Sequence, residues 1–462
     1  MEKKILILGD VFLDIFEETK SIKISPERPV PVLNPLHKTF LLGGAANVAN
    51  NVKSIGANPY LISKLSNDNT SKEIIKLLKR SKIDFKIFLN KKYSSPIKHR
   101  IVEKDHQFLR LDKEEETNLW SKHSSLIVKF IKKNIDKFDA LILSDYAKGF
   151  LTKDLIKQSI SIFKKNKKKI FTDPKQYDIS LYRGSDFICP NILEFKKLLK
   201  HKNLTFDRKS IKRIFNLSKV KAFIVTKGSI GVSIYMNNEK QINISQENIN
   251  VYDVTGAGDS FISFFTFFYT KKIDLINSVK LACYACKKIV QKKHTSVLQF
   301  DELKQLINNY CLENTIDIEL KIKLWNIAKF KIGVTNGCFD ILHSGHLQLF
   351  SKSKNYCDKL IVLINSDKSI RKLKGQNRPI NNLKTRIKLM KMIKGIDEIL
   401  PFEDLTPLKL IKKISPDLLF KGSDYTKKSV IGYEFLKKNG GTVKIIKKFK
   451  NYSSTNILNK NN

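Results

Sequence analysis

The chain has 462 residues, 42% of them hydrophobic, which is enough for two or three folded domains and argues against a wholly disordered protein. Lysine and arginine number 86 against 44 acidic residues, so the formal net charge is +42. The longest apolar runs, such as Phe261–Tyr269, are well short of the roughly 18 residues that span a bilayer, so we expect no membrane insertion.

The positive charge is distributed along the whole chain. Lysines often stand beside asparagine and isoleucine, there is no isolated basic arm, and few aromatic residues are interleaved with the basic ones. All three residue types have AT-rich codons, so a mutational bias of the genome explains the composition more simply than a polyanionic partner does. We therefore expect no specific nucleic-acid partner, although the charge can help to attract phosphorylated substrates.

The N-terminus and the cysteines both favour a cytoplasmic protein. The apolar run Ile5–Leu8 is shorter than the roughly 7–15 residues of a signal-peptide core, and it predicts a first buried strand. The six cysteines are scattered, and the one C-x-x-C pair, Cys283 and Cys286, lies in a segment of helical character without nearby histidines. Packing of reduced thiols explains this pattern better than a zinc site does.

Short apolar runs alternate with helix-length segments from residue 1 to about residue 312. Besides Ile5–Leu8, they lie at Ala140–Leu143, Lys169–Thr172, Phe187–Cys189 and Ala222–Thr226. Continuous apolar runs predict a parallel sheet covered by helices on both faces. Val30–Leu33 and Ile97–Leu111 alternate more strictly, which predicts a half-exposed antiparallel sheet that forms a small lid.

A second unit begins after the pattern weakens between about 313 and 330. Its first strand leads from Lys331 to the turn Asn336-Gly337, and Leu360–Asn365 is its next buried strand. The remaining length suits one compact α/β domain. We therefore predict two domains, residues 1–318 and 331–462, which share no detectable repeat and form a fusion.

A glycine-rich turn near residue 256 has the composition of a phosphate site. Residues 253–259 read Asp-Val-Thr-Gly-Ala-Gly-Asp and lead into an apolar run with helical potential. Gly256, Ala257 and Gly258 can offer backbone N–H groups to a phosphate at a helix N-terminus. Asp259 in the first turn can accept a hydroxyl proton. The alternative, a glycine turn with a helix-capping aspartate, is equally compatible with this segment alone.

Other segments favour the phosphate site, because together they resemble the PfkB, or ribokinase-like, carbohydrate kinases in family order. The resemblance rests on 9–14, 43–49, the N-x-x-E motif Asn191 to Glu194, 226–228 and 253–259. It implies a three-layer α/β/α domain with a β lid and ATP as phosphoryl donor. It further implies sugar contacts by Asp14, Gly43, Gly44 and Asn47, nucleotide contacts by Thr226 and Gly228, and phosphate and indirect Mg²⁺ contacts by Asn191 and Glu194.

The segment His343-Ser344-Gly345-His346 is a candidate nucleotidyl-transfer site. Nucleotidyl transfer needs positioned donors that stabilise charge on a triphosphate, and two imidazoles at a glycine-opened helix start can supply them. Two histidines that merely cap a helix are the alternative for this segment alone. Class I aminoacyl-tRNA synthetases carry the same signature, but a Lys-Met-Ser-Lys-Ser partner is absent here and the domain is too short.

The surrounding residues resemble the cytidylyltransferase-like family, which implies a Rossmann-like nucleotidyltransferase α/β domain. The resemblance covers 336–346, the segment Asn365-Ser366-Asp367 and the Ser/Thr segment 453–456. It implies catalytic His343 and His346. The implied nucleotide contacts are Asp367, Lys374, Ser453, Ser454 and Thr455, with Arg378 as a further triphosphate contact.

The order of the two domains is similar to that of the bifunctional heptose 7-phosphate kinase/heptose 1-phosphate adenylyltransferases. The segments 24–32, 143–149 and 421–425 strengthen this resemblance. It implies phosphorylation of D-glycero-β-D-manno-heptose 7-phosphate at C1 and adenylyl transfer from ATP to the 1-phosphate, giving ADP-heptose for the lipopolysaccharide inner core. A separate phosphatase acts between the two steps, and a homodimer, Mg²⁺ and a monovalent cation for the kinase are further expectations.

The sequence departs from the family pattern at two positions and leaves two alternative functions open. His294 and Ser423 stand where the family has glycine, and a larger residue disturbs a turn that needs a positive φ. The nearer alternative keeps both chemistries with another sugar phosphate or nucleotide base. The more distant one is a non-catalytic polyanion-binding protein, against which Asp259, His343 and His346 count.

Overall fold

A computed structural model describes residues 3–90, 94–104, 106–114, 121–237, 241–245, 253–292 and 296–447. The chain divides into two compact units, Met1–Leu306 and Ile307–Asn462, and the boundary falls within helix α9 (Phe300–Glu313). Each unit has its own main sheet. None of the helices in the described part of the chain is long and apolar enough to cross a bilayer.

The first unit is built on a sheet of nine strands among its described residues. In spatial order they are β13 (Ile242–Ser245), β12 (Gly231–Met236), β11 (Ala222–Thr226), β10 (Phe187–Ile188), β9 (Lys169–Asp173), β8 (Ala140–Ser144), β1 (Lys4–Gly9), β4 (Asn58–Leu65) and β5 (Asp84–Leu89). From β11 to β5 every pairing is parallel, whereas β12 is antiparallel to both neighbours. The five predicted apolar runs all form strands of this sheet.

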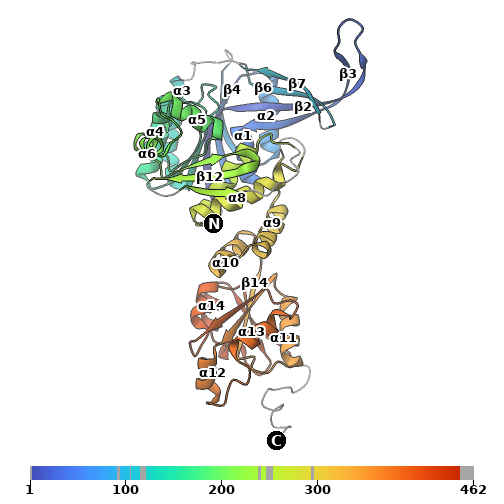
Figure 1. Ribbon diagram of the computed structural model, residues 1–462, viewed down its shortest axis with the longest axis vertical. Helices are drawn as coiled ribbons and strands as arrows, with labels where there is room; N and C mark the ends of the chain where they lie inside the picture. Colours follow the sequence, from blue (N-terminus) through green and yellow to red (C-terminus); the bar gives the residue numbers. More distant parts are fainter. Residues whose placement is uncertain are drawn as a thin grey trace. The chain divides into compact units, whose positions relative to one another are not determined.

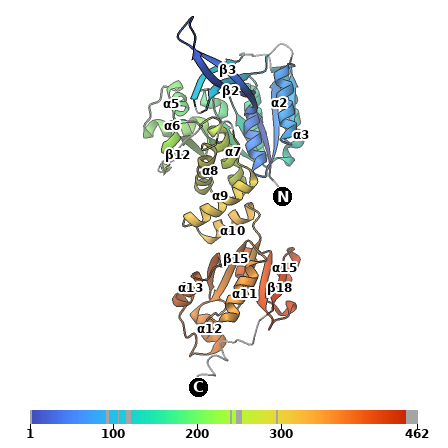
Figure 2. The same cartoon turned by 90° about the vertical axis from the view of Figure 1, so that its right-hand side faces the viewer.

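Helices cover both faces of the sheet, because alternate residues of each strand point to opposite sides and are apolar on both (Figure 1). One face carries α3 (Ser121–Asn134), α4 (Lys153–Lys165), α5 (Ile192–His201) and α6 (Arg208–Ser218), which share a core with Leu6, Leu8, Leu141 and Leu143. The other face carries α1 (Ala45–Ser54), α7 (Ala257–Thr270) and α8 (Leu275–Ile289), and α7 and α8 lie side by side (Figure 2). Helix α2 (Asn69–Arg80) completes the unit beside β5.

A second sheet of the first unit confirms the predicted lid. Its order is β3 (Pro31–Gly44), β2 (Val11–Ile24), β6 (Ile97–Glu103) and β7 (His106–Lys113). The far part of the β2–β3 hairpin extends beyond the rest of the unit and is largely exposed (Figures 1 and 2). The near ends of these two strands are buried and bring Asp14 and Gly43 to the edge of the main sheet.

The second unit holds a five-stranded parallel sheet among its described residues. The order is β16 (Glu398–Phe402), β15 (Lys359–Asn365), β14 (Ile332–Gly337), β17 (Leu418–Gly422) and β18 (Thr442–Ile446). Its helices are α11 (Ser344–Lys354), α12 (Asp367–Lys374), α13 (Leu383–Lys391), α14 (Leu408–Ile414) and α15 (Tyr433–Lys438). The strand order reverses at β14, and in such sheets ligands bind beyond the carboxyl ends of the strands at the reversal.

The segment before β14 contains a helix that the sequence pattern does not reveal. Helix α10 (Ile318–Ile327) buries Trp325, and its Lys321 Nζ lies 2.7 Å from Glu398 Oε2 of β16. Asn308, in α9, accepts a hydrogen bond from Lys359 Nζ at 2.6 Å. Residues 307–330 therefore pack on the sheet of the second unit, to which they belong.

Candidate active sites

A cavity of about 220 Å³ lies at the carboxyl ends of the central strands of the first unit. Its lining includes residues from the lid, the main sheet and the start of α7, namely Phe12, Asp14, Lys98, Arg100, Asp145, Tyr146, Asp173, Lys175, Cys189, Asn191, Glu194, Thr226, residues 254–259 and Phe261. Residues far apart in the sequence thus meet at one edge of the sheet, where ligands bind in open α/β folds.

The glycine-rich turn begins helix α7, as the sequence predicts. Gly256 caps the helix with a φ of 75°, a conformation that glycine adopts at little cost. The helix is mostly apolar and almost entirely buried, so its packing fixes the direction of its N-terminus. A Cβ added at Gly258 would meet nothing within 4 Å, so the backbone here is open to an approaching phosphate.

Asp259 lies in the first turn of α7, lines the cavity and is only 6% exposed. Its Oδ2 accepts a hydrogen bond from Asn47 Nδ2 at 2.9 Å, and its Oδ1 accepts one from the Tyr146 hydroxyl. Burial raises the pKa of Asp259 to about 6, although these two hydrogen bonds favour the ionised form. At neutral pH the carboxylate is ionised and can accept a proton from a hydroxyl in the cavity.

A chain of buried amides sets the orientation of the Asn47 side chain. Asn51 Nδ2 donates to Asn47 Oδ1 at 3.1 Å, and Ser260 Oγ donates to Asn51 Oδ1 at 3.2 Å. Because its oxygen is occupied, Asn47 directs its NH₂ group toward Asp259. Asn47 therefore contacts the carboxylate itself, whereas the sequence resemblance implies a sugar contact.

The lid side of the cavity combines an acidic and two basic residues. Asp14 forms a buried ion pair with Arg100, with Oδ1 and Nη1 2.5 Å apart. Lys98 lies over the ring of Phe12, 3.9 Å from its centroid, and burial lowers the pKa of this lysine. A Cβ at Gly43 would come within 2.6 Å of Asp14 Oδ2, so glycine is required where β3 passes this carboxylate. Carboxylate and cations together suit a sugar phosphate, with its hydroxyls and its anionic group.

The opposite side of the cavity carries the N-x-x-E motif. Asn191 and Glu194 form a capping box at the start of α5, in which Glu194 Oε2 accepts the Asn191 N–H at 2.9 Å. Glu194 Oε1 is paired with Lys175 Nζ at 2.6 Å. Asp173 also lines the cavity, and burial together with the charge of Glu194 raises its pKa well above the usual range.

The donor set on this side fits a magnesium ion that arrives with ATP. No group of three or more histidine, cysteine or acidic side chains suited to a metal occurs among the described residues. Mg²⁺ in nucleotide sites takes one or two carboxylates, and phosphates and water supply the rest. Asp173 and Glu194 would be the carboxylates of this chain that face such an ion.

Most residues predicted for this site line the cavity, but four do not. Asp14, Asn191, Glu194, Thr226, Gly256, Ala257, Gly258 and Asp259 line it, whereas Gly43, Gly44, Asn47 and Gly228 lie outside the lining. Gly43 and Asn47 touch residues that do line it. Sequence reasoning missed Tyr146, Lys98, Arg100, Asp173 and Lys175. Tyr146 stands in the family segment 143–149, which was the one available signal for it.

A larger cavity, about 490 Å³, lies at the carboxyl ends of β14 and β17 in the second unit. Its lining draws on the H-x-G-H segment, α12, and the segments that follow β16, β17 and β18, namely residues 336–339, His343, Gly345, His346, Gln348, Leu349, Asn365, Leu373, Lys374, Phe402, Leu405, Pro407, Lys421, Gly422, Asp424, Tyr425, Ser429, Ile431, Ile446 and Lys447. The cavity is at the reversal of strand order, where the fold places ligands.

The two histidines of the motif face this cavity together. His343 caps α11 and His346 lies in its first turn, so their rings stack with centroids 3.7 Å apart and an angle of 25°. Phe339, with a φ of 46°, packs edge-on against His346 at 5.0 Å and holds one side of the pair. A left-handed conformation is costly for a bulky residue and here is maintained by burial. Adjacent imidazoles at a helix start can donate to the oxygens of a polyphosphate.

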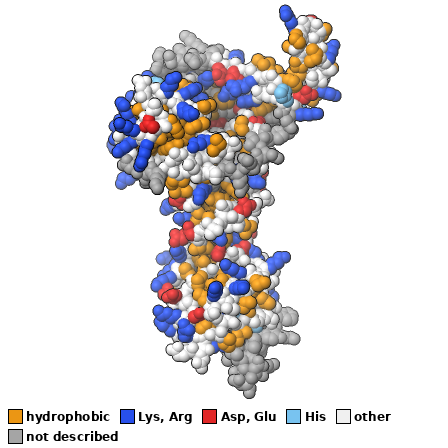
Figure 3. Space-filling view, in the orientation of Figure 1, with side chains coloured by type: hydrophobic (Ala, Val, Ile, Leu, Met, Phe, Trp, Pro, Cys, Tyr) orange, Lys and Arg blue, Asp and Glu red, His pale blue; other side chains and the backbone are white. Residues whose placement is uncertain are grey.

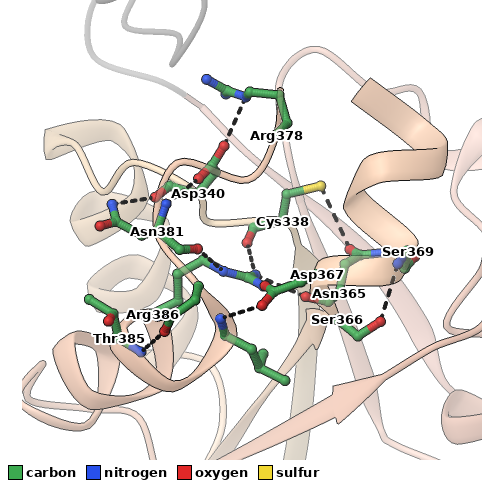
Figure 4. Close-up of polar contacts among 12 residues, drawn as sticks. Cys338, Asp340, Asn365, Ser366, Asp367, Ser369, Arg378, Asn381, Thr385 and Arg386 are labelled. Carbon is green, nitrogen blue, oxygen red and sulfur yellow. Dashed lines mark hydrogen bonds and ion pairs between the residues drawn. The ribbon is translucent and has the colours of Figure 1, made fainter. Parts of the chain in front are cut away.

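Arg386 organises the loops that carry the motif (Figure 4). It is 1% exposed, and it donates to the backbone oxygens of Cys338 and Asn365 at 2.6 and 2.9 Å. Its Nη2 also lies 2.7 Å from Asp367 Oδ1. The ends of β14 and β15 are thereby joined through one guanidinium. Asp367, predicted to contact the nucleotide, does not line the cavity and instead anchors this arginine.

The other predicted nucleotide contacts differ in whether they line this cavity. Lys374 lines the cavity. Arg378 does not, and its Nε is paired with Asp340 Oδ2 at 2.9 Å. Ser453, Ser454 and Thr455 lie outside the described residues. Lys421, Asp424 and Tyr425, from the family segment 421–425, line the cavity and were not among the predicted contacts.

The two departures from the family pattern, Ser423 and His294, and the high net charge are compatible with the two candidate sites. Ser423 is not among the described residues with a positive φ, so its backbone does not require glycine. His294 lies outside the described residues. Lysine and arginine are scattered over the visible faces of both units and do not form one basic surface (Figure 3).

Comparisons with known proteins agree with the two sites. Residues 2–300 match the family described as pfkB family carbohydrate kinase, and residues 334–460 match the cytidylyltransferase-like family. A ribokinase from Thermotoga maritima aligns over 66% of this chain and 99% of its own with a TM-score of 0.51, at 18% identity. A mutant of phosphofructokinase-2 from Escherichia coli aligns over 66% and 98% with a TM-score of 0.54, at 17% identity. At these identities the likeness shows the fold.

Curated relatives match the chain over nearly its whole length. The bifunctional protein HldE of Marinomonas sp. is 32% identical over 471 residues, covering 100% of this chain and 98% of that protein. The HldE protein of Haemophilus influenzae is 34% identical, with 99% and 97% covered. That of Helicobacter acinonychis is 36% identical, with 94% of each covered.

The fold and the sites define a bifunctional enzyme, a PfkB carbohydrate kinase joined to a cytidylyltransferase-like nucleotidyltransferase. ATP is the nucleotide substrate that this combination implies. The chain belongs to the family of the bifunctional HldE proteins. The resemblance found in the sequence is thereby confirmed along the whole chain.

Proposed function

We propose that the first unit phosphorylates C1 of D-glycero-β-D-manno-heptose 7-phosphate with ATP, giving the 1,7-bisphosphate. Asp259 accepts the proton of the C1 hydroxyl, and the first-turn N–H groups of α7 face the transferred phosphate. Asp14 contacts the sugar hydroxyls, and Lys98 neutralises charge on the sugar phosphate. Both residues line the cavity that holds Asp259, which supports this arrangement.

The second unit joins heptose 1-phosphate to the adenylyl group of ATP and releases pyrophosphate. An oxygen of the sugar phosphate attacks the α-phosphorus, and the bond to the bridging oxygen of the β-phosphate breaks. His343 and His346 donate hydrogen bonds to the polyphosphate as charge moves onto the leaving group. Lys374 and the segment Ser453–Thr455 complete the phosphate contacts. The product, ADP-heptose, is the donor for the lipopolysaccharide inner core.

The observation that carries this proposal is the agreement over the full length with HldE proteins, with a cavity at each expected reactive side chain. Neither domain alone would identify the sugar substrate. Their combination restricts it to a substrate that is phosphorylated at C1 and then activated at the same phosphate.

The finer properties belong to the same proposal. Mg²⁺ accompanies ATP in both domains, and Asp173 and Glu194 would face it in the kinase. A monovalent cation assists the kinase reaction, and the enzyme is a cytoplasmic homodimer. A separate phosphatase removes the 7-phosphate between the two steps, because the second domain accepts the 1-phosphate.

The decisive experiment supplies purified protein with heptose 7-phosphate, ATP, Mg²⁺ and the bisphosphate phosphatase, and follows ADP-heptose by mass spectrometry. We expect the bisphosphate without the phosphatase and ADP-heptose with it. Heptose 1-phosphate supplied directly should give ADP-heptose and pyrophosphate without the first domain's substrate. Absence of activity with the heptose phosphates and ATP, together with activity on another sugar phosphate or with CTP, would show that the assigned sugar or base is wrong.

A further inference from the structure

The lining of the transferase cavity includes a second lysine besides Lys374, namely Lys421. It lies near the carboxyl end of β17 and lines the cavity together with His343 and His346. Its Nζ donates to the backbone oxygen of Asn336 at 2.9 Å, and it lies 4.8 Å from the ring centroid of Tyr425. The strand end and the Asn336 carbonyl thus fix the ammonium beside the H-x-G-H segment.

Asp424 lines the same cavity, and its charge acts on this ammonium. Burial lowers the pKa of Lys421 to about 8, and the charges of Asp424 and Cys338 oppose that shift. A partly buried cation that faces a cavity gains more from a phosphate dianion than from water.

The position of Lys421 favours the nucleotide over the sugar phosphate as the source of that phosphate. β17 pairs with β18, and Ile446 and Lys447 at the end of β18 also line the cavity. Tyr425, Ile431 and Ile446 on the same side provide the aromatic and aliphatic surface that an adenine ring requires.

We propose that the Lys421 ammonium binds the triphosphate of ATP in the transferase domain. This assignment rests on the proposed adenylyl transfer and deepens it. Lys421 keeps its proton throughout, because the reaction forms one phosphorus–oxygen bond and breaks another, and pyrophosphate leaves with the bonding electron pair. Lys421 contributes N–H donors to the phosphate oxygens, and it lies on the other side of β14 from Lys374, in α12 after β15.

The assignment has a consequence for pH dependence. The charged form of Lys421 binds phosphate and is present below pH 8, so kcat/KM for ATP in adenylyl transfer should fall as the pH rises through 8. The terminal phosphate of ATP is already fully ionised there, since its last proton leaves near pH 6. Other charged or titratable groups that line the cavity are His343, His346, Lys374, Lys447, Asp424, Tyr425 and Cys338.

The test measures pyrophosphate release by the full-length protein with ATP and heptose 1-phosphate, for wild type, Lys421→Met, Lys421→Arg and Lys444→Met. Lys444 is the matched control, because it lies on β18 over the ring of Tyr356 and does not line the cavity. Kinase activity and the unfolding temperature of each preparation verify folding.

We expect Lys421→Met to lower kcat/KM for ATP by about ten- to hundredfold, the range for a lost hydrogen bond to a charged group. The KM for heptose 1-phosphate should change little, Lys444→Met should match wild type, and Lys421→Arg should retain most activity and lose the decline above pH 8. Unchanged kcat/KM for ATP in Lys421→Met, a loss confined to heptose 1-phosphate, or an unchanged pH profile in Lys421→Arg would overturn the assignment. A wild type that releases no pyrophosphate would instead overturn the proposed function, and this assignment with it.

Discussion

Asp259 combines deep burial with a requirement for negative charge. Its folded-state pKa of about 6 lies above the ordinary value of 3.8, so the folded state loses stability as the pH rises from about 4 to 6. Above pH 6 the full cost is present, on the order of 3 kcal/mol for a shift of this size. The kinase cavity therefore maintains a charge that destabilises the fold at neutral pH.

Replacing Asp259 by asparagine separates these two effects. We expect Asp259→Asn to cut kinase turnover by about a hundred- to ten-thousandfold, since it removes the general base. Heptose 7-phosphate binding should remain near normal, transferase activity should be unaffected, and the unfolding temperature should rise. Steady-state kinetics, calorimetric titration with the sugar phosphate and thermal melts measure the three effects. Full kinase activity in this variant would exclude the assigned base.

The pH profile of the kinase should report the same carboxylate. Because the base must be ionised, kcat/KM should fall below pH 6. The Tyr146 hydroxyl donates to Asp259 and favours its ionised form, so Tyr146→Phe should move this acid limb to higher pH. Tyr425→Phe, in the other unit, is the control and should leave the kinase profile unchanged. An acid limb that does not move in Tyr146→Phe would show that another group governs it.

In the second unit, His346→Ala removes one of the two stacked imidazoles. We expect pyrophosphate release from ATP and heptose 1-phosphate to fall by about a hundred- to thousandfold or to disappear, the range for a donor that acts on developing charge. Kinase activity of the same preparation serves as the control and should be unchanged. Pyrophosphate release by His346→Ala at the wild-type rate would mean that His346 has only a structural role in the first turn of α11.

At the level of elements, the transferase site depends on the arginine that connects its strand ends. Arg386, on α13, joins the ends of β14 and β15 and pairs with Asp367, the first residue of α12. Two loops at the edge of the cavity, those that follow β14 and β15, therefore share one side chain, and their spacing depends on it.

Arg386→Met should test that dependence. It leaves backbone oxygens and the Asp367 carboxylate without their donor, which costs about 3 kcal/mol or more for a buried charge pair. We expect loss of transferase activity at a lower temperature than in wild type, with unchanged heat inactivation of the kinase. Arg371→Met, an exposed arginine of α12, is the matched control. Equal heat inactivation of the transferase in both variants would contradict the assigned role.

The strands could be predicted from local patterns, whereas the two sites were predicted through the family resemblance. Continuous apolar runs marked the parallel strands, strict alternation marked the lid, and the glycine turn before an apolar run marked the start of α7. Helix α10 was not predictable, because its pattern is weak and the buried Trp325 has a partner, Lys359, in a distant part of the chain. The same reason hid Tyr146 and Arg386, whose partners lie far away in the sequence.

Asp367 illustrates what a family motif specifies about a residue and what it does not. The residue occupies the expected position after β15, and its side chain pairs with Arg386, 19 positions further on. A motif specifies the residue type and the strand end. It does not specify which neighbour the side chain will meet.

For the whole molecule, the two units predict two separable activities. The main sheet, the lid and the kinase cavity all lie before residue 307, and helix α9 ends at Glu313. A fragment of residues 1–318, the predicted first domain, keeps α9 whole and omits nearly all of α10, which packs on the second unit.

We expect residues 1–318 expressed alone to fold and to phosphorylate heptose 7-phosphate at close to the rate of the full chain. Circular dichroism and bisphosphate formation measure both properties. Residues 307–462, the second unit, retain α10, overlap the first fragment over 307–318 and should carry out adenylyl transfer. A folded 1–318 fragment without kinase activity would contradict independent domains.

The capping box of α5 has one more consequence for how the kinase accepts its nucleotide. Both oxygens of Glu194 are already engaged, one by the amide of its own helix and one by Lys175. The amide is fixed by the helix, whereas the lysine side chain is 46% exposed and can swing into solvent. An incoming Mg²⁺ would therefore take the place of an ammonium beside Glu194, so that a divalent cation would replace a monovalent one at this carboxylate.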